Sequence, residues 1–170
     1  RTIRSDIPTE PYIVAHNGAQ RGWEFKKYPM MEAVCGLIQS KLGIRVVSVG
    51  GPDEYIFGTI DATCRQIRET AYILEHSVAY LGTDTGTYHM SAALGKKGVA
   101  IFTATSIGKN WDAKFHSSIK PIQRTDIDCC PCQKQFHLMS SLTKCQDFKC
   151  RNLPVLKVYD EICSIITNTP

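Results

Sequence analysis

Short apolar runs alternate along the chain with segments in which apolar residues recur every three or four positions. A short run bounded by glycine or proline predicts a buried strand, and the three-to-four spacing predicts a helix with one apolar face. The predicted strands cover residues 12–15, 44–49, 78–81 and 98–103. Because helices are predicted between the strands, the pattern indicates a parallel sheet covered on both faces. The expected fold class is α/β, with a Rossmann-like doubly wound parallel sheet.

Proline and glycine mark the expected helix boundaries. Pro29 opens the first helix at a position where its missing N–H costs nothing, and Gly43 ends it. A short helix is predicted over residues 87–94, and a final helix begins after Pro154. The chain between residues 103 and 154 has no clear period and is expected to be a loop. The clearest apolar stripe predicts one more helix, through Ile60, Cys64, Ile67, Ala71 and Leu74.

Size and charge limit the classes of function. The chain has 170 residues, enough for one domain with a core, and its net charge is +4. Lysine and arginine are scattered along the sequence, so a nucleic-acid partner is not expected. No apolar stretch is long enough to span a bilayer, and the polar N-terminus lacks the apolar segment of a signal peptide. We expect residues 1–10 to be a linker or a truncation scar and residues 11–170 to be one domain in the cytoplasm, with peripheral contact to the inner membrane as an option.

Candidate chemistry gathers where the predicted strands end. The carboxyl ends of parallel strands meet at one edge of the sheet, where ligands bind in such folds. Asp84-Thr85-Gly86-Thr87 joins a strand to a helix, whose first turn has unpaired N–H groups and a partial positive charge. This predicts a phosphate seat, with Gly86 allowing close approach and Thr85 and Thr87 adding hydroxyl donors. Asp84 would accept hydrogen bonds from sugar hydroxyls or from backbone N–H groups. The alternative interpretation is an ordinary helix cap with a turn glycine.

Charged residues after the other strands would complete such a site. Either Lys26 or Lys27 could reach a diphosphate as a point charge, and the alternative is a solvated lysine. Glu54 could accept both hydroxyls of a ribose, as acidic residues do in other doubly wound folds, or lie on the surface. His89 could donate to a phosphate or pack beneath the loop.

Taken together, these segments resemble the heptosyltransferases of glycosyltransferase family 9. Residues 82–95, GTDTGTYHMSAALG, resemble the family signature DTGxxHxxAALG. Residues 16–19 (HNGA) with 27–29 (KYP) resemble its HPGA and KxWP elements, and Tyr28 stands where the family usually has Trp. Residues 50–54 (GGPDE) resemble GGPxE, and 130–132 (CPC) resemble a CxPC-like element.

The resemblance implies a two-domain GT-B enzyme, of which this chain is the half that binds the sugar nucleotide. It implies residue roles as well. Lys27 would contact the diphosphate, Glu54 the ribose and Asp84 the donor sugar, while Thr85 and Gly86 would give backbone N–H groups to the diphosphate with Thr87 and His89 beside them.

The implied reaction is metal-independent, inverting transfer from ADP-heptose, or a related nucleoside diphosphate sugar, to a glycan or lipid-linked acceptor of a bacterial surface glycan such as lipopolysaccharide. The general base would lie in an N-terminal domain outside this chain, so no catalytic residue is assigned and the chain alone is expected to be inactive. Two other functions stay open. One is a domain of a sugar-nucleotide epimerase-type enzyme, and the other is a non-catalytic nucleotide-sugar-binding module.

Eight cysteines are present, and five of them fall between residues 129 and 150 in a Cys-rich loop over residues 128–152. Four thiolates could hold a structural zinc or iron ion in tetrahedral geometry, with His137 as a replacement ligand. The alternatives are reduced thiols or a disulfide formed on purification. The candidate ligands are Cys129, Cys132, Cys145 and Cys150. Cys35, Cys64 and Cys163 are isolated and are expected to be reduced thiols on apolar faces.

Overall fold

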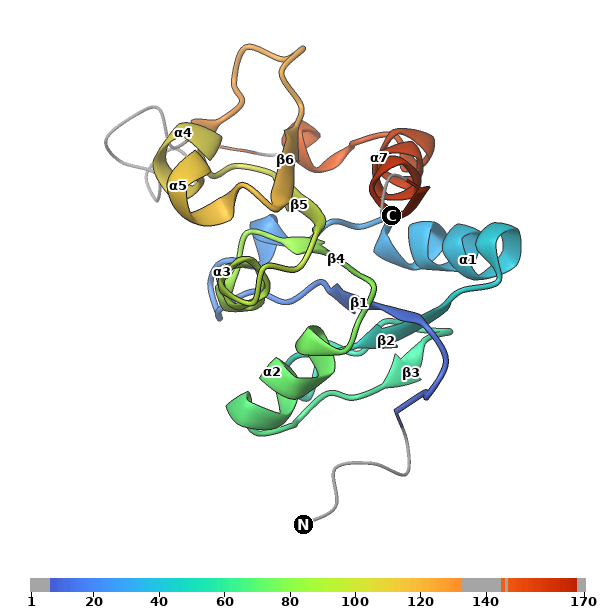
Figure 1. Cartoon of the computed structure of the whole chain (residues 1–170). Helices are drawn as coiled ribbons and strands as arrows, with labels where there is room; N and C mark the ends of the chain where they lie inside the picture. Colours follow the sequence, from blue (N-terminus) through green and yellow to red (C-terminus); the bar gives the residue numbers. More distant parts are fainter. Residues whose placement is uncertain (1–6, 133–144, 146, 168–170) are drawn as a thin grey trace.

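Six parallel strands form the sheet of the computed structural model, which describes residues 7–132, 145 and 147–167 (Figure 1). The strand order is β3-β2-β1-β4-β5-β6, and every neighbouring pair is parallel. The strands are β1 (Tyr12–His16), β2 (Arg45–Ser48), β3 (Ile60–Asp61), β4 (Ala79–Thr83), β5 (Gly98–Phe102) and β6 (Ile119–Gln123). The order reverses between β1 and β4, and such a switch point is where an open α/β sheet binds its ligand.

Helices cover both faces of this sheet (Figure 1). Helices α1 and α7 pack on one face, and α2 and α3 pack on the other together with the short α4–α5 segment. The helices in the described residues are α1 (Met31–Leu42), α2 (Ile67–Glu75), α3 (Gly86–Ala93), α4 (Ile107–Asn110), α5 (Ala113–His116) and α7 (Val155–Thr167), and the 3₁₀ turns described there are η1 (Glu24–Lys26) and η3 (Lys149–Arg151). The predicted α/β doubly wound class is therefore confirmed.

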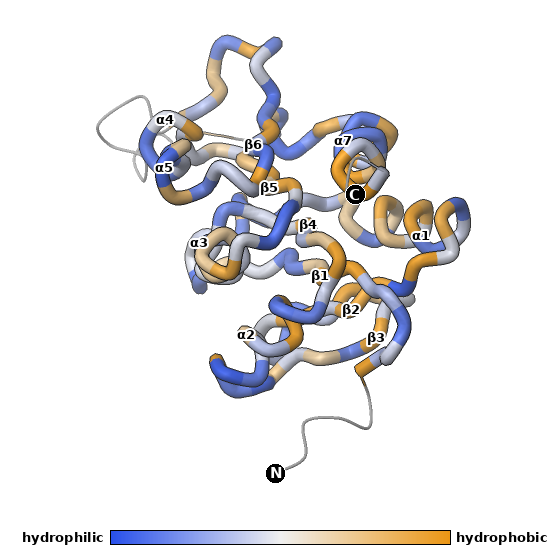
Figure 2. The backbone as a smooth tube through the Cα atoms, in the orientation of Figure 1, coloured by the Kyte–Doolittle hydropathy of each residue, from blue (hydrophilic) through white to orange (hydrophobic). Residues whose placement is uncertain are grey.

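Strand β1 shows why the sheet is buried on both sides. All five of its residues are buried, and successive side chains point to opposite faces. Ile13 and Ala15 join the core under α1 and α7, whereas Tyr12 and Val14 join the core under α2 and α3. The hydrophobic residues accordingly lie along the strands and along the helix sides that face them (Figure 2). No described helix has the length and apolar character needed to cross a bilayer.

The predicted helix over residues 60–74 is too long at its start. Ile60 lies in β3, and α2 begins at Ile67, a residue that is 72% exposed. Gln66 and Glu69 form a capping box that fixes this start, because each side chain bonds the other's backbone N–H. Cys64, expected on an apolar face, is exposed and has a φ of 58°. The apolar spacing that ran through Ile60 was therefore coincidental.

The prediction of a loop between residues 103 and 154 is also wrong in part. This stretch contains α4, α5 and the edge strand β6. Strand β6 includes Pro121, which cannot donate to a ladder and is tolerated at a sheet edge. Because Lys120 and Pro121 interrupt its five residues, this strand contains no continuous apolar run and was not predicted.

Candidate functional site

The loops after β1 and β2 meet at the carboxylate of Glu54. Its Oε1 accepts the backbone N–H of Ala19 at 3.0 Å, and its Oε2 accepts that of Gly51 at 2.7 Å. Its Oε2 also lies 3.2 Å from Nε2 of His16. The hydrogen bond with His16 is the main reason that the pKa of Glu54 falls to about 2, against the opposing effect of burial. Glu54 is thus a clamp between two loops, and the surface-glutamate alternative does not hold.

Two glycines leave the space that this carboxylate fills. A Cβ at Gly18 would stand 2.1 Å from Oε1 of Glu54, and a Cβ at Gly50 would stand 2.5 Å from Oε2. Gly50 also has a φ of 142°, which favours glycine. Gly18 of the HNGA segment and Gly50 of the GGPDE segment therefore both leave room for the carboxylate of Glu54.

A row of side-chain hydrogen bonds leads from this clamp to the start of α3. Nδ1 of His16 lies 3.0 Å from Oγ1 of Thr85, which lies 3.0 Å from Oγ1 of Thr87. The hydroxyl of Tyr80 is 3.1 Å from the same oxygen of Thr87. Thr85 is the N-cap residue of α3, but its side chain makes no capping hydrogen bond. The first turn of α3 therefore has N–H groups that Thr85 does not cap, and the phosphate seat expected there stays a prediction.

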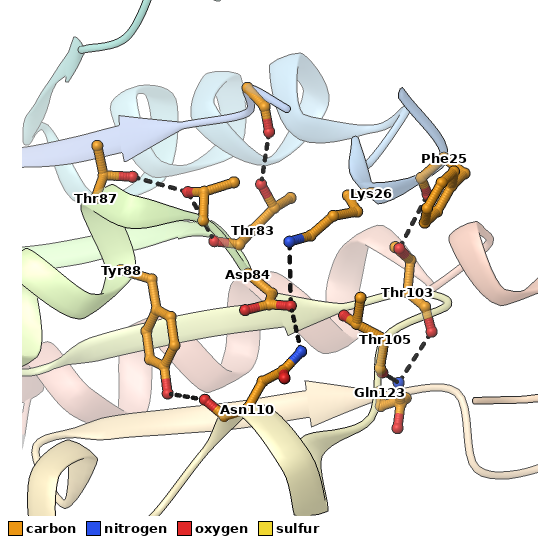
Figure 3. A network of polar contacts seen from close by, with 12 residues as sticks. Phe25, Lys26, Thr83, Asp84, Thr87, Tyr88, Thr103, Thr105, Asn110 and Gln123 are labelled. Carbon is orange, nitrogen blue, oxygen red and sulfur yellow. Dashed lines mark hydrogen bonds and ion pairs between the residues drawn. The ribbon is translucent and has the colours of Figure 1, made fainter. Parts of the chain in front are cut away.

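Asp84 is buried at the end of β4, and two side chains hold it (Figure 3). Nζ of Lys26 lies 3.2 Å from its Oδ2, and Nδ2 of Asn110 donates to the same oxygen at 2.9 Å. Asp84 is only 3% exposed, so its charge is compensated inside the protein. Asp84 therefore lies directly before the start of α3 with a lysine and an amide as its partners, and its contact with a sugar hydroxyl stays a prediction.

The structure brings Lys26, and not Lys27, to this loop. Lys27 lines a separate small cavity of about 110 Å³ that also touches Glu54 and Tyr55. Its backbone carbonyl accepts a hydrogen bond from Nε of Arg151 at 2.8 Å. The next residue, Tyr28, is fully buried and its hydroxyl donates to the carbonyl of Leu153 at 2.8 Å. Lys27 and Tyr28 are thus tied to Arg151 and Leu153, while the ammonium group of Lys26 lies beside Asp84.

His89 lies in the first turns of α3 and contacts another histidine. Its Nδ1 is 2.9 Å from Nε2 of His116, at the end of α5. Burial and the neighbouring His116 lower the pKa of His89. Asp84 raises the pKa of His89 and Lys26 lowers it further, both as smaller causes.

The sequence pattern did not predict α4 and α5. These helices carry Asn110, which contacts Asp84, and His116, which contacts His89. The carbonyl of Asn110 accepts a hydrogen bond from the hydroxyl of Tyr88 at 3.2 Å (Figure 3). Nε1 of Trp111 donates to the carbonyls of Ile119 at 2.9 Å and His116 at 3.2 Å. These bonds fix the segment between α3 and β6. No local motif marks it, and only recognition of β6 would have suggested that it lies here.

The five cysteines between residues 129 and 150 lie near one another and next to Phe25, the residue before Lys26. Cys130 and Cys150 are buried with Phe25 and Ala104, and Sγ of Cys130 donates to the carbonyl of Thr103 at 3.2 Å. Burial, with the neighbouring cysteines as a smaller cause, raises the pKa of Cys150 to about 12. The remaining members, Cys129, Cys132 and Cys145, are close enough to act on it electrostatically.

Metal binding by these cysteines stays a prediction. Among the described residues, no three histidine, cysteine or acidic side chains are placed to hold a metal ion. His137 lies outside the described residues. Elsewhere, Cys35 is buried as expected and Cys163 is partly exposed.

The family follows from a comparison with known families. The model of glycosyltransferase family 9 (heptosyltransferase) matches residues 2–144. The match covers well over half of the chain, and the chain belongs to this family. A search of curated proteins finds no match.

Solved structures show the same fold at low sequence identity. The heptosyltransferase WaaC of E. coli with ADP is 20% identical over 68% of this chain and 39% of its own, with a TM-score of 0.58. A family 9 glycosyltransferase of Veillonella parvula is 16% identical over 95% and 47%, with a TM-score of 0.68. The dodecameric iron-containing heptosyltransferase TibC, solved with ADP-D-β-D-heptose and found in enterotoxigenic E. coli, is 14% identical over 95% and 45%, with a TM-score of 0.72.

This chain therefore spans less than half the length of these structures. Its sheet is one half of a GT-B fold.

Proposed function

We propose that this chain binds a nucleoside diphosphate sugar and forms the donor-binding half of an inverting heptosyltransferase. The observation that carries the proposal is the uncapped N-terminus of α3 beside the Lys26–Asp84 pair. A helix N-terminus and one adjacent cation together suit a diphosphate. The structures solved with ADP and with ADP-heptose support an ADP-heptose-type donor.

Lys26 takes the diphosphate role that the family resemblance had given to Lys27. Its ammonium group lies 3.2 Å from the carboxylate of Asp84. Asp84 comes directly before Thr85 and Gly86, the residues proposed to face the phosphates. An ammonium group has three donors, so Lys26 can bridge the carboxylate and a phosphate oxygen at once. Asp84 in turn orients Lys26 and offers its remaining oxygen to a sugar hydroxyl.

Glu54 has a double role in this proposal. Three protein donors already approach its two oxygens, which together have about four lone-pair sites. One acceptor site is therefore left for a ribose hydroxyl.

Charge builds on the leaving diphosphate as the bond to the anomeric carbon breaks. The α3 N-terminus and Lys26 would stabilise that charge by fixed dipoles and one cation, without a metal ion. A general base must activate the acceptor hydroxyl, and we assign it to the half of the enzyme that this chain does not contain. The proposal includes a glycan or lipid-linked acceptor, a bacterial surface glycan as product and a cytoplasmic location, all of which rest on the family.

Calorimetry on the 170-residue chain tests the binding function. We expect ADP to bind, Lys26→Met to weaken it by about tenfold or more, and Lys27→Met to change it by no more than about twofold. The two variants remove the same charge from adjacent positions, so each controls for the other. Equal losses would refute the assignment to Lys26. Failure of the unaltered chain to bind ADP, GDP or UDP would refute the function itself.

A structural metal ion at Cys129, Cys132, Cys145 and Cys150 is a separate proposal. Thiolates suit zinc or iron, and TibC is described as iron-containing. The described side chains do not surround an ion as they stand, so binding would require some of them to turn toward one point. Elemental analysis should find about one zinc or iron per chain, and substitution of Cys129 and Cys132 by Ser should remove it. Protein purified without either metal would disprove this proposal and leave the binding function untouched.

A further inference from the structure

Two histidines meet beside the phosphate-facing loop, and one of them must donate to the other. Nδ1 of His89 and Nε2 of His116 are 2.9 Å apart, a normal distance for one N–H and one lone pair. The family signature includes His89, whereas no motif includes His116. The direction of this hydrogen bond decides which nitrogen of His89 carries a proton.

The surroundings of His116 fix that direction. The backbone N–H of Asp112 donates to Nδ1 of His116 at 3.1 Å. The carbonyl of Asp112, which lies 3.2 Å from the same nitrogen, already accepts the N–H groups of Phe115 at 3.0 Å and His116 at 2.8 Å. Nδ1 of His116 therefore acts as an acceptor. A neutral imidazole with an acceptor at Nδ1 carries its proton on Nε2.

The proton on Nε2 of His116 then points at Nδ1 of His89. Because that nitrogen of His89 accepts, neutral His89 carries its own proton on Nε2, its second ring nitrogen. The lowered pKa of His89 agrees with a neutral ring, since burial and His116 both disfavour its protonation and Lys26 adds to them, while Asp84 opposes. His89 is exposed, and an N–H on its Nε2 is a donor suited to a phosphate oxygen.

His116 is held well enough to impose this arrangement. Its ring stacks on the ring of Tyr88, with centroids 4.8 Å apart and planes 24° from parallel. Its carbonyl accepts Nε1 of Trp111 at 3.2 Å. The imidazole is therefore fixed by a stacked ring, a backbone donor and its own main chain, on a segment anchored to β6.

We infer that His116 is a positioning residue that holds His89 as a neutral donor, with its Nε2–H directed to the diphosphate of a bound sugar nucleotide. The inference rests on the proposed function and adds a residue to its site. His116 touches no ligand in this scheme, and it acts only through His89. Its removal should therefore weaken ligand binding only while His89 is present.

A spectroscopic test needs no ligand. In the chain with ¹⁵N-labelled histidine, a scalar coupling between Nε2 of His116 and Nδ1 of His89 should appear in NMR spectra, with the proton attached to His116. A proton attached instead to Nδ1 of His89, or no coupling between the two nitrogens, overturns the inference. Both results are independent of whether the chain binds any nucleotide.

A double-mutant cycle tests the functional part, with ADP as the probe in calorimetry. His116→Phe keeps a ring against Tyr88 and removes the donor, so ADP affinity should fall on the order of fivefold. His116→Gln offers a side-chain N–H and should restore the affinity to within about twofold. In a His89→Ala background, His116→Phe should have no further effect.

Equal losses from His116→Phe with and without His89 would show a merely structural role and overturn the inference. Thermal unfolding of each variant checks that it is folded. If the unaltered chain does not bind ADP, GDP or UDP, the proposed function fails and the directed contact with a diphosphate fails with it. The NMR result then still decides the contact between the two histidines.

Discussion

The two sides of α3 are built in different ways. On the side of β1 and β2, Glu54 is surrounded by backbone N–H groups and by glycines that leave it room. On the side of β5 and β6, Asn110 and His116 reach the site from two short helices whose positions depend on Trp111. The first side is set by backbone geometry, which allows few residue types. The second is set by side-chain contacts between distant segments, which tolerate more substitution.

Gly18→Ala should have the largest effect, because its new Cβ would clash with Glu54 on the side of the site next to β1 and β2. The new Cβ would stand 2.1 Å from the Glu54 carboxylate, so one of the two must move. We expect a loss of about 3 kcal/mol in the free energy of unfolding, measured by urea denaturation, and loss of ADP binding. Gly36→Ala is the matched control, since Gly36 is exposed on α1 and no described atom would lie within 4 Å of the new Cβ. It should stabilise the chain by about 0.5 kcal/mol. Equal stability of both variants would contradict the steric fit.

Glu54→Gln separates the charge of the clamp from its shape. The folded state holds the pKa of Glu54 at about 2, below its ordinary value of 4.5. The stability that this provides is therefore complete above pH 4.5 and is lost as the pH falls toward 2. We expect Glu54→Gln to cost on the order of 2 kcal/mol at pH 7 and much less at pH 2.

The measurement is urea denaturation at several pH values, and Asp126→Asn is the control. Asp126 pairs with Arg124 at an exposed site, where an ion pair contributes little. A constant cost of Glu54→Gln from pH 7 to pH 2 would show that charge plays no part in the clamp.

Asn110→Ala tests the side built from distant contacts and should have the smallest effect. Asp84 would lose one hydrogen bond but keep Lys26 as its partner. We expect unfolding to become easier by about 1 kcal/mol and ADP affinity to fall by about threefold in calorimetry. Lys114→Ala, at an exposed position of the neighbouring α5, should change neither. If Asn110→Ala lowered the free energy of unfolding as much as Gly18→Ala does, the two sides of α3 would not differ in their tolerance of substitution.

The same contrast explains what could be predicted from sequence. Four buried strands and the turn at Gly43 were readable, since apolar runs and glycine report directly on burial and backbone conformation. The strand β6 was not, because an edge strand with Pro121 carries little apolar signal. Lys26 and Lys27 could not be separated, because their directions depend on contacts with Arg151 and Leu153, more than 120 residues away.

The contacts of Lys27 with Arg151 and of Tyr28 with Leu153 also affect when the Lys26 loop can be held in place during synthesis. Tyr28 and the carbonyl of Lys27 are tied to Leu153 and Arg151, which lie beyond the matched family region of residues 2–144. During synthesis from the N-terminus, the loop that carries Lys26 is made early but can be fastened only after the chain has passed Leu153. A nascent chain that is released before that residue would carry the signature segment without the contacts that hold the loop of Lys26, the lysine that pairs with Asp84.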